Sequence, residues 1–381
     1  MSSFYAIASL LAGGGIGSIA YRAALGLERA GRLGKLAALG HRPVDIADAR
    51  LLDVRFAPRR ALFFLDDKQF YWLKNRRFDA ACRRALPPDC DVVHLWNSQA
   101  TGTARLAGRR GKKLIIDRAS THIRAQTDTL VEAYARSGVD YEPTYRETID
   151  RCLEEYELAD VVLTPSRVVD DSFAKRGFNM SKVVRCPFGV DLARVTPREK
   201  PPEKFVALFV GQIGVRKGVP TLLAAWDKAG LDGELWLAGG EEEAGGAFLT
   251  KWRERSDVRW LGYRRDVPDL LRQASAFVFP TLEEGSALVT YEAMAAGVPQ
   301  ILTAAAGAVA RDGREALFIE PYDVDGLAAA LTRLAERPEL AWQLGECARE
   351  RVQKFPWSAY GERIAAVHAA LAEGRPLPTF D

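Results

Sequence analysis

Residues Glu284–Pro299 read EGSALVTYEAMAAGVP, and they give the clearest indication of structure in the second half of the chain. It follows an apolar run at Ala276–Phe279 that predicts a buried strand, and it predicts a helix over Leu288–Ala296. Small residues in the intervening loop leave backbone amides free at the helix N-terminus, where the helix dipole favours an anion. A diphosphate would fit this corner of an α/β sheet. The small residues are Gly285, Ser286 and Ala287.

Two carboxylates flank the expected diphosphate position. Glu284 lies in the loop, near the hydroxyl groups of whatever the diphosphate carries. Glu292 lies about one turn into the helix, where it could accept hydrogen bonds from a ribose. A simpler interpretation also fits, in which Glu284 is a favourable charge at a helix N-terminus and Glu292 is a solvated surface residue. The spacing alone leaves both open.

A glycine-rich turn, GQIGVRKG at Gly211–Gly218, directly follows an expected strand at Phe205–Val210. Such turns, at the carboxyl ends of parallel strands, are where open α/β sheets bind ligands. Arg216 and Lys217 would offer cations to a phosphate there. The spacing does not match the GxxxxGK[ST] phosphate loop. A solvated basic turn without a ligand is the alternative.

Short apolar runs alternate with longer amphipathic segments along the 381 residues, which predicts βα units and parallel sheets. Three prolines among charges at Thr196–Lys204 indicate a linker between two Rossmann-like halves. Helices are expected after the last strand, and the final one could cross back onto the first half. The expected strands are Phe4–Leu11, Ala61–Leu65, Val92–Leu95, Leu114–Asp117, Val161–Thr164, Val183–Cys186, Phe205–Val210, Glu234–Ala238, Val258–Leu261, Ala276–Phe279, Gln300–Leu302 and Leu317–Ile319.

Another glycine cluster, GGGIG, follows the first expected strand. Its Gly15 and Gly17, with Ala20, satisfy the GxGxxA form of the dinucleotide fingerprint, which favours a nicotinamide-dependent oxidoreductase. Asp45 and Asp48 fall where that fold places an acidic residue, but no well-formed second strand precedes them. A tight strand-to-helix turn without a ligand is the other interpretation.

Cysteine and histidine patterns argue against a disulfide framework or a metal centre. The five cysteines are widely spaced without a CxxC pair, which indicates a reducing cytosol. The four histidines are too scattered for local metal-ligand spacing. His122 lies in a polar loop after an expected strand, beside Arg118 and Arg124, where it could contact a leaving-group or acceptor oxygen. A surface histidine is the simpler interpretation.

The charge is divided unevenly along the chain. Residues 1–200 carry 33 Lys and Arg against 24 Asp and Glu, although the net charge of the whole chain is only +3. Between Arg50 and Arg124 the basic residues outnumber the acidic ones by 17 to 7. This face could meet an anionic membrane surface or a lipid-phosphate acceptor, or it could be a solvated helix face. The total is too small to indicate nucleic acid. Aromatic residues interleaved with the charges are Phe63, Phe64, Phe70, Tyr71 and Trp72.

Taken together, these motifs resemble the retaining glycosyltransferases of family 4 (GT4), which have the GT-B fold. The resemblance rests on the turn ending at Lys217 and Gly218, on Trp260–Tyr263, on Ala274–Thr281, and above all on Glu284–Pro299. It covers about residues 205–320. The first half is matched mainly by its glycine turn and its general layout.

The resemblance implies an α/β architecture of two facing Rossmann-like domains with parallel sheets. Residues 1–196 would form the acceptor domain, and residues 205–355 the domain that holds a nucleotide-sugar donor. Residues 356–381 would form a helix that returns to the first domain.

The resemblance also implies the roles of individual residues. Glu284 would contact sugar hydroxyls and Glu292 the ribose, while Lys217 and loop amides hold the diphosphate. The sequence departs from the family at Gln212, where an arginine is usual, and Arg216 could supply that charge instead. The loop amides are those of Ser286, Ala287 and Leu288.

The first-domain contact is left open, because Arg118 and His122 are competing matches in the loop that contains AST. Tyr263 and Arg264 are candidates for contact with the nucleotide base. The remaining candidate contacts are Gly214 and Gly285 for the donor, with Gly14, Gly15 and Gly17 in the first-domain turn.

The implied activity is the retaining, metal-independent transfer of a sugar from a nucleotide-diphospho-sugar. That molecule is a substrate, so no cofactor is expected. The acceptor would be a glycan or lipid-linked glycan in cell-envelope or exopolysaccharide synthesis, with the protein in the cytoplasm or peripheral at the inner face of the membrane. No DxD pair stands in a suitable loop, and no residue is an obvious covalent nucleophile. The alternatives are a nucleotide-sugar epimerase of the same fold, a NAD-dependent oxidoreductase and a non-catalytic nucleotide-binding subunit.

Overall fold

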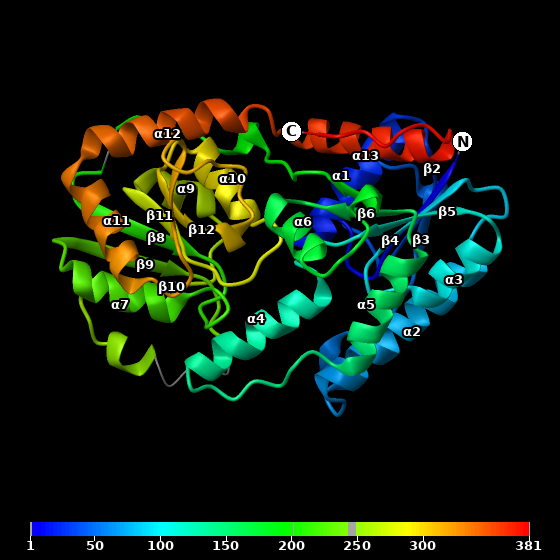
Figure 1. The fold of residues 1–381 in the computed structure, drawn as a ribbon, viewed down its shortest axis with the longest axis horizontal. Coiled ribbons are helices and arrows are strands. Elements are labelled where there is room, and N and C mark those ends of the chain that lie inside the picture. Colours follow the sequence, from blue (N-terminus) through cyan, green and yellow to red (C-terminus); the bar gives the residue numbers. More distant parts are fainter. Residues whose placement is uncertain (1, 201, 243–248, 381) are drawn as a thin grey trace.

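Two all-parallel β-sheets, each flanked by helices, organise the chain (Figure 1). The computed structural model describes residues 2–200, 202–242 and 249–380. The first sheet has the strand order β3-β2-β1-β4-β5-β6-β7, and the second has the order β10-β9-β8-β11-β12-β13. In both sheets the first strand of the unit lies centrally and the order reverses beside it, which is the doubly wound arrangement. The predicted fold of two Rossmann-like halves is confirmed.

The first sheet is built from buried strands that alternate with helices. Its central strands β1 and β4 pair in parallel, with Phe4 opposite Val93. The strands are β1 (Ser3–Ile7), β2 (Leu33–Ala38), β3 (Leu51–Asp53), β4 (Val92–Trp96), β5 (Lys113–Asp117), β6 (Val161–Thr164) and β7 (Val183–Arg185). The helices are α1 (Ile16–Arg29), α2 (Asp67–Ala85), α3 (Thr101–Arg109), α4 (Ile123–Arg136), α5 (Arg146–Leu158) and α6 (Arg167–Ala174).

The second sheet contains all six strands that the sequence predicts for this half. β8 lies between β9 and β11, with Ala207 opposite both Leu235 and Ala276. The strands are β8 (Phe205–Val210), β9 (Gly233–Ala238), β10 (Val258–Gly262), β11 (Ala276–Phe279), β12 (Gln300–Thr303) and β13 (Ala316–Ile319). The helices are α7 (Val219–Ala229), α9 (Val267–Gln273), α10 (Leu288–Ala295), α11 (Val324–Glu336) and α12 (Pro338–Val352).

Three expectations for the first half are wrong. Ala61–Leu65 is not a strand: the chain forms a short 3₁₀ helix at Arg59–Leu62, and Phe63 and Phe64 are 80% and 68% exposed. No layer covers this apolar run, so it gains nothing from pairing in a sheet. The first strand ends at Ile7 rather than Leu11. β2 and β3 were not predicted, because Gly34 and Lys35 interrupt the apolar pattern of β2 and β3 is only three residues long.

The last helix, α13 (Trp357–Ala372), runs back onto the first domain and lies along α1 (Figure 1). The two helices cross at two glycines. A Cβ added to Gly26 would lie 2.4 Å from the Cα of Gly361, so the backbones approach more closely than any side chain allows. At its far end α13 is tied into the sheet through His368, which bonds Ser3 Oγ at 2.8 Å and His94 at 3.0 Å.

The glycine crossing predicts a position-specific loss of stability. Gly26→Ala should lower the free energy of unfolding of the protein by about 1–3 kcal/mol, the usual cost of overpacking a fitted core. Gly108→Ala is the matched control, since Gly108 also lies in a helix but a Cβ there would meet nothing within 4 Å. That change should be neutral or stabilising by up to about 1 kcal/mol. Equal urea midpoints for the two variants would contradict the close crossing.

Candidate functional site

Two motif loops of the second domain meet because their strands are neighbours in the sheet. The turn Gly211–Gly218 leaves the carboxyl end of β8, and the loop before α10 leaves the carboxyl end of β11. Leu282 donates its amide to the Arg216 carbonyl at 2.9 Å. Gly218 has a φ of 70°, and a Cβ there would lie 1.9 Å from the Pro280 carbonyl oxygen. Only glycine allows the two loops this approach.

Four charged side chains gather where these loops touch. The Lys217 ammonium forms an ion pair with the Glu284 carboxylate and lies 5.1 Å from the centre of the Phe279 ring. Arg216 Nη1 lies 3.6 Å from Glu284 Oε2 and 3.7 Å from Glu283 Oε2. The predicted gathering of Lys217, Arg216 and Glu284 is therefore present in the structure. Glu283 was not anticipated.

Lys217 is almost completely buried, and this changes its chemistry. Burial lowers the pKa of the ammonium to about 7, and the neighbouring Arg216 acts in the same direction, opposed by Glu283. An anion placed against Lys217 would favour the charged form and raise that pKa. A phosphate group is an anion that could make this contact.

The N-terminus of α10 borders the charged cluster. The amides of Leu288 and Val289 lie in the first turn, where a helix provides no acceptor of its own. The Ala287 amide donates to the Ala306 carbonyl at 3.0 Å, so of the three loop amides expected to hold a diphosphate, this one is already engaged. The Ser286 hydroxyl also turns inward and donates to the Gly307 carbonyl at 2.9 Å.

Glu292 lies one turn further along α10 and is partly buried. Burial raises the pKa of its carboxyl to about 7, while the positive charge of Arg194 acts in the opposite direction. The interpretation of Glu292 as a solvated surface residue does not fit this environment. A partly buried carboxyl is suited to accept hydrogen bonds from hydroxyl groups.

A cavity of about 300 Å³ adjoins the turn at the carboxyl ends of β8, β9 and β10. Its lining includes Gln212, Tyr263 and Arg264. Tyr263 and Arg264, the two candidates for base contact, therefore line the same cavity. Tyr263 is 78% exposed, and Arg264 Nε donates to Asp266 at 2.8 Å. The absence of an arginine at position 212 leaves this side of the cavity without a cation from the turn.

Gly214 is needed for a contact that the sequence did not reveal. The Glu242 carboxylate accepts a hydrogen bond from the Val215 amide at 3.0 Å and another from the Tyr134 hydroxyl of α4. A Cβ on Gly214 would lie 2.1 Å from that carboxylate. Burial raises the pKa of Glu242, and the Val215 amide acts in the opposite direction.

In the first domain, the Arg118 guanidinium is buried and engaged by its own surroundings. Nε and Nη2 donate to the Thr121 carbonyl at 2.8 and 2.6 Å. Nη1 donates to Asn97 Oδ1 at 3.3 Å, and Nη2 also donates to Gln126 Oε1 at 2.7 Å. Arg118 is thus fixed at the cleft side of β5, where it organises the loop ahead of α4.

His122 lies in a different environment from Arg118. It is the N-cap of α4, with Nδ1 accepting from the Arg124 amide at 3.3 Å, and its ring packs against Tyr156 and Phe173. Burial, together with the charges of nearby arginines, lowers the pKa of His122 to about 4. The ring borders a separate cavity of about 580 Å³ with Lys175 and Arg176. Arg118, unlike His122, is linked through Gln126 to the charged cluster.

The glycine turn before α1 is tightly packed. A Cβ on Gly17 would lie 2.1 Å from the Leu10 carbonyl oxygen, whereas Gly14 and Gly15 face open space. β2 does precede Asp45, contrary to the expectation that no strand does, but β2 ends at Ala38 and is followed by Leu39, Gly40 and His41. No acidic side chain therefore follows β2 directly, where a dinucleotide-binding fold places one for the ribose.

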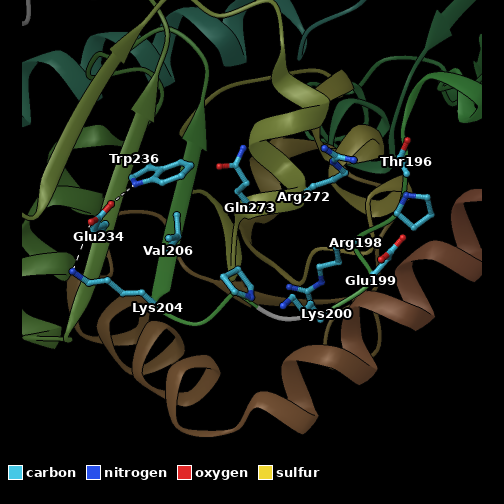
Figure 2. Close-up of a pocket in the computed structure, with 12 residues that line it drawn as sticks. Thr196, Arg198, Glu199, Lys200, Lys204, Val206, Glu234, Trp236, Arg272 and Gln273 are labelled. Carbon is cyan, nitrogen blue, oxygen red and sulfur yellow. Dashed lines mark hydrogen bonds and ion pairs between the residues drawn. The ribbon is translucent and has the colours of Figure 1, made fainter.

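A further cavity, of about 570 Å³, lies at the amino ends of β8 and β9 beside the linker (Figure 2). Figure 2 shows Lys204 directed toward Glu234, at 3.7 Å, and Glu234 toward the Trp236 indole, at 2.8 Å. Arg198 is buried there and donates to the Ala274 carbonyl at 3.2 Å. Pro201 of the expected linker lies outside the described residues. Ligands of such sheets bind at the carboxyl ends of the strands, so this cavity is not part of the site.

Residues 2–200, 202–242 and 249–380, which the structure describes, show neither a cluster of metal-binding side chains nor a helix that could span a membrane. In these ranges no group of three or more His, Cys, Asp or Glu side chains is arranged to hold a metal ion. None of the helices in the same ranges has the length and apolar character needed to span a bilayer.

Family models match both halves of the chain. The model described as Glycosyltransferase Family 4 matches residues 13–194, and the model described as Glycosyl transferases group 1 matches residues 204–337. Among curated proteins, the mannosylfructose-phosphate synthase of Agrobacterium fabrum is 26% identical over an alignment of 267 residues that covers 62% of this chain and 58% of that protein. The alpha-maltose-1-phosphate synthase of Mycolicibacterium smegmatis is 29% identical over an alignment of 211 residues that covers 50% of this chain and 51% of that protein. The match thus spans little more than half the length of these relatives.

Solved structures share the whole fold. A sucrose-phosphate synthase from Thermosynechococcus elongatus superposes with a TM-score of 0.72 at 19% identity, covering 98% of this chain and 99% of that one. Anabaena HepE, solved in complex with UDP and glucose, superposes with a TM-score of 0.68 at 15% identity, covering 97% of this chain and 100% of that one. At such identities the likeness concerns the fold alone.

Proposed function

We propose, since this chain belongs to glycosyltransferase family 4 and has the GT-B fold, that it transfers a sugar from a nucleotide-diphospho-sugar to an acceptor. One observation carries the proposal. Lys217, Arg216 and the free amides of the α10 N-terminus converge at the carboxyl ends of β8 and β11. This is where a leaving diphosphate would need positive charge.

Binding of the donor would replace the counter-ion of Lys217. Lys217 now pairs with Glu284, and the phosphate oxygens would take the place of this carboxylate. Released from Lys217, Glu284 would be free to accept hydrogen bonds from sugar hydroxyls. Cleavage of the glycosyl–phosphate bond moves negative charge onto the diphosphate, and fixed cations and amides stabilise that charge best in a buried site. No metal ion is needed in this scheme.

The nucleoside would occupy the adjoining cavity. Glu292 would bind the ribose hydroxyls, and Tyr263 would lie beside the base. The complex of Anabaena HepE with UDP supports a nucleoside diphosphate as the ligand class in this fold. The nucleotide sugar is consumed as a substrate, and we propose no cofactor.

Retention of the anomeric configuration would follow a front-side route. Glu284, the carboxylate nearest the expected sugar, would still have Arg216 beside it after its release from Lys217 and would accept hydrogen bonds from the sugar hydroxyls, so no carboxylate is left free to act as a nucleophile. An ion-pair-like transition state on the face of the leaving diphosphate does not require a covalent intermediate.

The acceptor would bind the first domain. A cavity of about 800 Å³ lies between α2 and the start of α5, with Tyr71, Trp72 and Tyr145 in its walls and Ser98 at the carboxyl end of β4. Aromatic walls with a few polar groups suit the rings of a glycan or the apolar part of a lipid-linked glycan. Such acceptors occur in cell-envelope or exopolysaccharide synthesis.

The surface beside this cavity would meet an anionic membrane. Phe63 and Phe64 project into solvent, and Arg76 lies over the Trp72 ring at 5.0 Å. Exposed aromatic residues among cations are suited to the headgroup region of a bilayer. We therefore place the protein in the cytoplasm, peripheral at the inner face of the cell membrane.

The donor site predicts the effect of removing its cation. Lys217→Ala, which removes the cation, and Glu284→Ala, which removes the expected sugar contact, should each lower sugar transfer by about 100-fold or more. This is the usual cost of losing a group that stabilises developing charge. Lys228→Ala is the control, because Lys228 is exposed on α7 and pairs with the exposed Asp325. Transfer is measured with a panel of UDP, GDP and ADP sugars. Full activity of both site variants would refute the proposal, and donor consumption without an acceptor would indicate an epimerase.

The membrane proposal predicts co-sedimentation with vesicles of phosphatidylcholine and phosphatidylglycerol at low salt. Replacing both Phe63 and Phe64 by Ser should lower the affinity by about 100-fold or more, because each buried aromatic ring contributes roughly 1.5–3 kcal/mol. Met180→Ser, which changes an exposed apolar residue elsewhere, should have no effect. A protein that stays in the supernatant even at low salt would rule the membrane contact out.

A further inference from the structure

Glu283 is a buried carboxylate of the second domain whose hydrogen-bond donors belong to the first. It is 2% exposed and directly precedes Glu284 in the loop before α10. Thr121 Oγ1 donates to its Oε1 at 3.1 Å, and Gln126 Nε2 donates to its Oε2 at 3.3 Å. A buried carboxylate is costly unless it is hydrogen-bonded or paired, so this group depends on the contact between the domains.

A continuous polar chain crosses the cleft through this carboxylate. Arg118 donates to Gln126 at 2.7 Å, and Gln126 donates to Glu283. Glu283 Oε2 lies 3.7 Å from Arg216 Nη1, which lies 3.6 Å from Glu284 Oε2. Glu284 pairs in turn with Lys217. The chain as a whole joins Arg118 of the first domain to the two cations expected at the diphosphate.

The distances show how Arg216 is held. Its Nη1 donates to the backbone carbonyl of Glu283 at 3.1 Å, while the Glu283 carboxylate stays beyond hydrogen-bond distance at 3.7 Å. Thr121 and Gln126 occupy one carboxylate oxygen each. Neutral donors from the first domain thus hold the Glu283 carboxylate in an orientation that leaves its Oε2 3.7 Å from Arg216 Nη1, short of a tight ion pair.

We propose that Glu283 is a positioning residue, held by Thr121 and Gln126 so that Arg216 remains available to the donor diphosphate only while the two domains are in contact. This inference rests on the proposed function. If the domains separate, the carboxylate loses both neutral donors and draws Arg216 to itself, which neutralises the cation. Arg216 then becomes available beside Lys217 only when the two domains come together, so the donor is activated only in the closed form.

Other contacts between the domains do not depend on Glu283. Ser166 Oγ donates to the Gly285 carbonyl, and Leu130 and Tyr134 of α4 pack against Val215 and Leu282. A variant that alters the Glu283 link therefore leaves the domain contact in place. Its effect on transfer can be separated from a loss of structure.

A double-mutant cycle between Gln126 and Arg216 tests the proposal. Gln126→Ala alone should lower kcat for sugar transfer by about 10- to 100-fold, the size expected for a hydrogen bond to a charged group. In an Arg216→Ala background the same change should cost less than about 2-fold, because no cation is left to position. Asp128→Ala is the control on the same helix, since Asp128 pairs with Arg176 outside the cluster, and it should leave kcat unchanged.

Two results would overturn the positioning role. One is full activity of Gln126→Ala. The other is a double variant in which the separate fold-losses of kcat from Gln126→Ala and Arg216→Ala multiply, which indicates independent structural effects. The unaltered protein is measured in the same assay. If it transfers no sugar, the proposed function fails and this inference fails with it, whereas multiplying penalties in an active enzyme refute this inference alone.

Discussion

The close approach of two loops in the second domain is the constraint on which the site depends. β8 and β11 are neighbours in the sheet although about 70 residues separate them in the chain, so their carboxyl-end loops must share the same space. Gly218 allows the approach, because any side chain there would strike the Pro280 carbonyl. Lys217 and Glu284 are brought together as a consequence. The charges of the site follow from the strand order.

Burial and neighbouring charges then determine the pKa of Lys217 in this charged cluster. Lys217 is buried beside a second cation, and the lowered pKa shows that its charged form is poorly supported by the protein alone. Two carboxylates of the same loop provide partial compensation. A diphosphate provides more, and it displaces the carboxylate that would next contact the sugar. Before the donor binds, Lys217 and Glu284 are thus each other's partner.

The sequence predicted the second domain well and the first less well, for physical reasons. The strands β8–β13 are apolar runs bounded by polar loops, whereas β2 is interrupted by Gly34 and Lys35 and is held in place mainly by its pairing with β1. The motif residues Arg216, Lys217 and Glu284 could be predicted to lie together, since each follows a recognisable strand. Glu283 and Glu242 could not, because their partners Thr121, Gln126 and Tyr134 lie more than 100 residues away in the other domain. The engagement of the Ala287 amide by Ala306 also required the tertiary structure.

A crystal structure of the protein with a bound nucleoside diphosphate tests the central claim most directly. Crystals exposed in parallel to UDP and to NAD would show which of the two glycine turns holds an anion. We expect the diphosphate of UDP at Lys217 and at the amides that begin α10, with Glu284 released from Lys217. A diphosphate bound instead at the Gly13–Gly17 turn, with the Lys217–Glu284 pair intact, would contradict it.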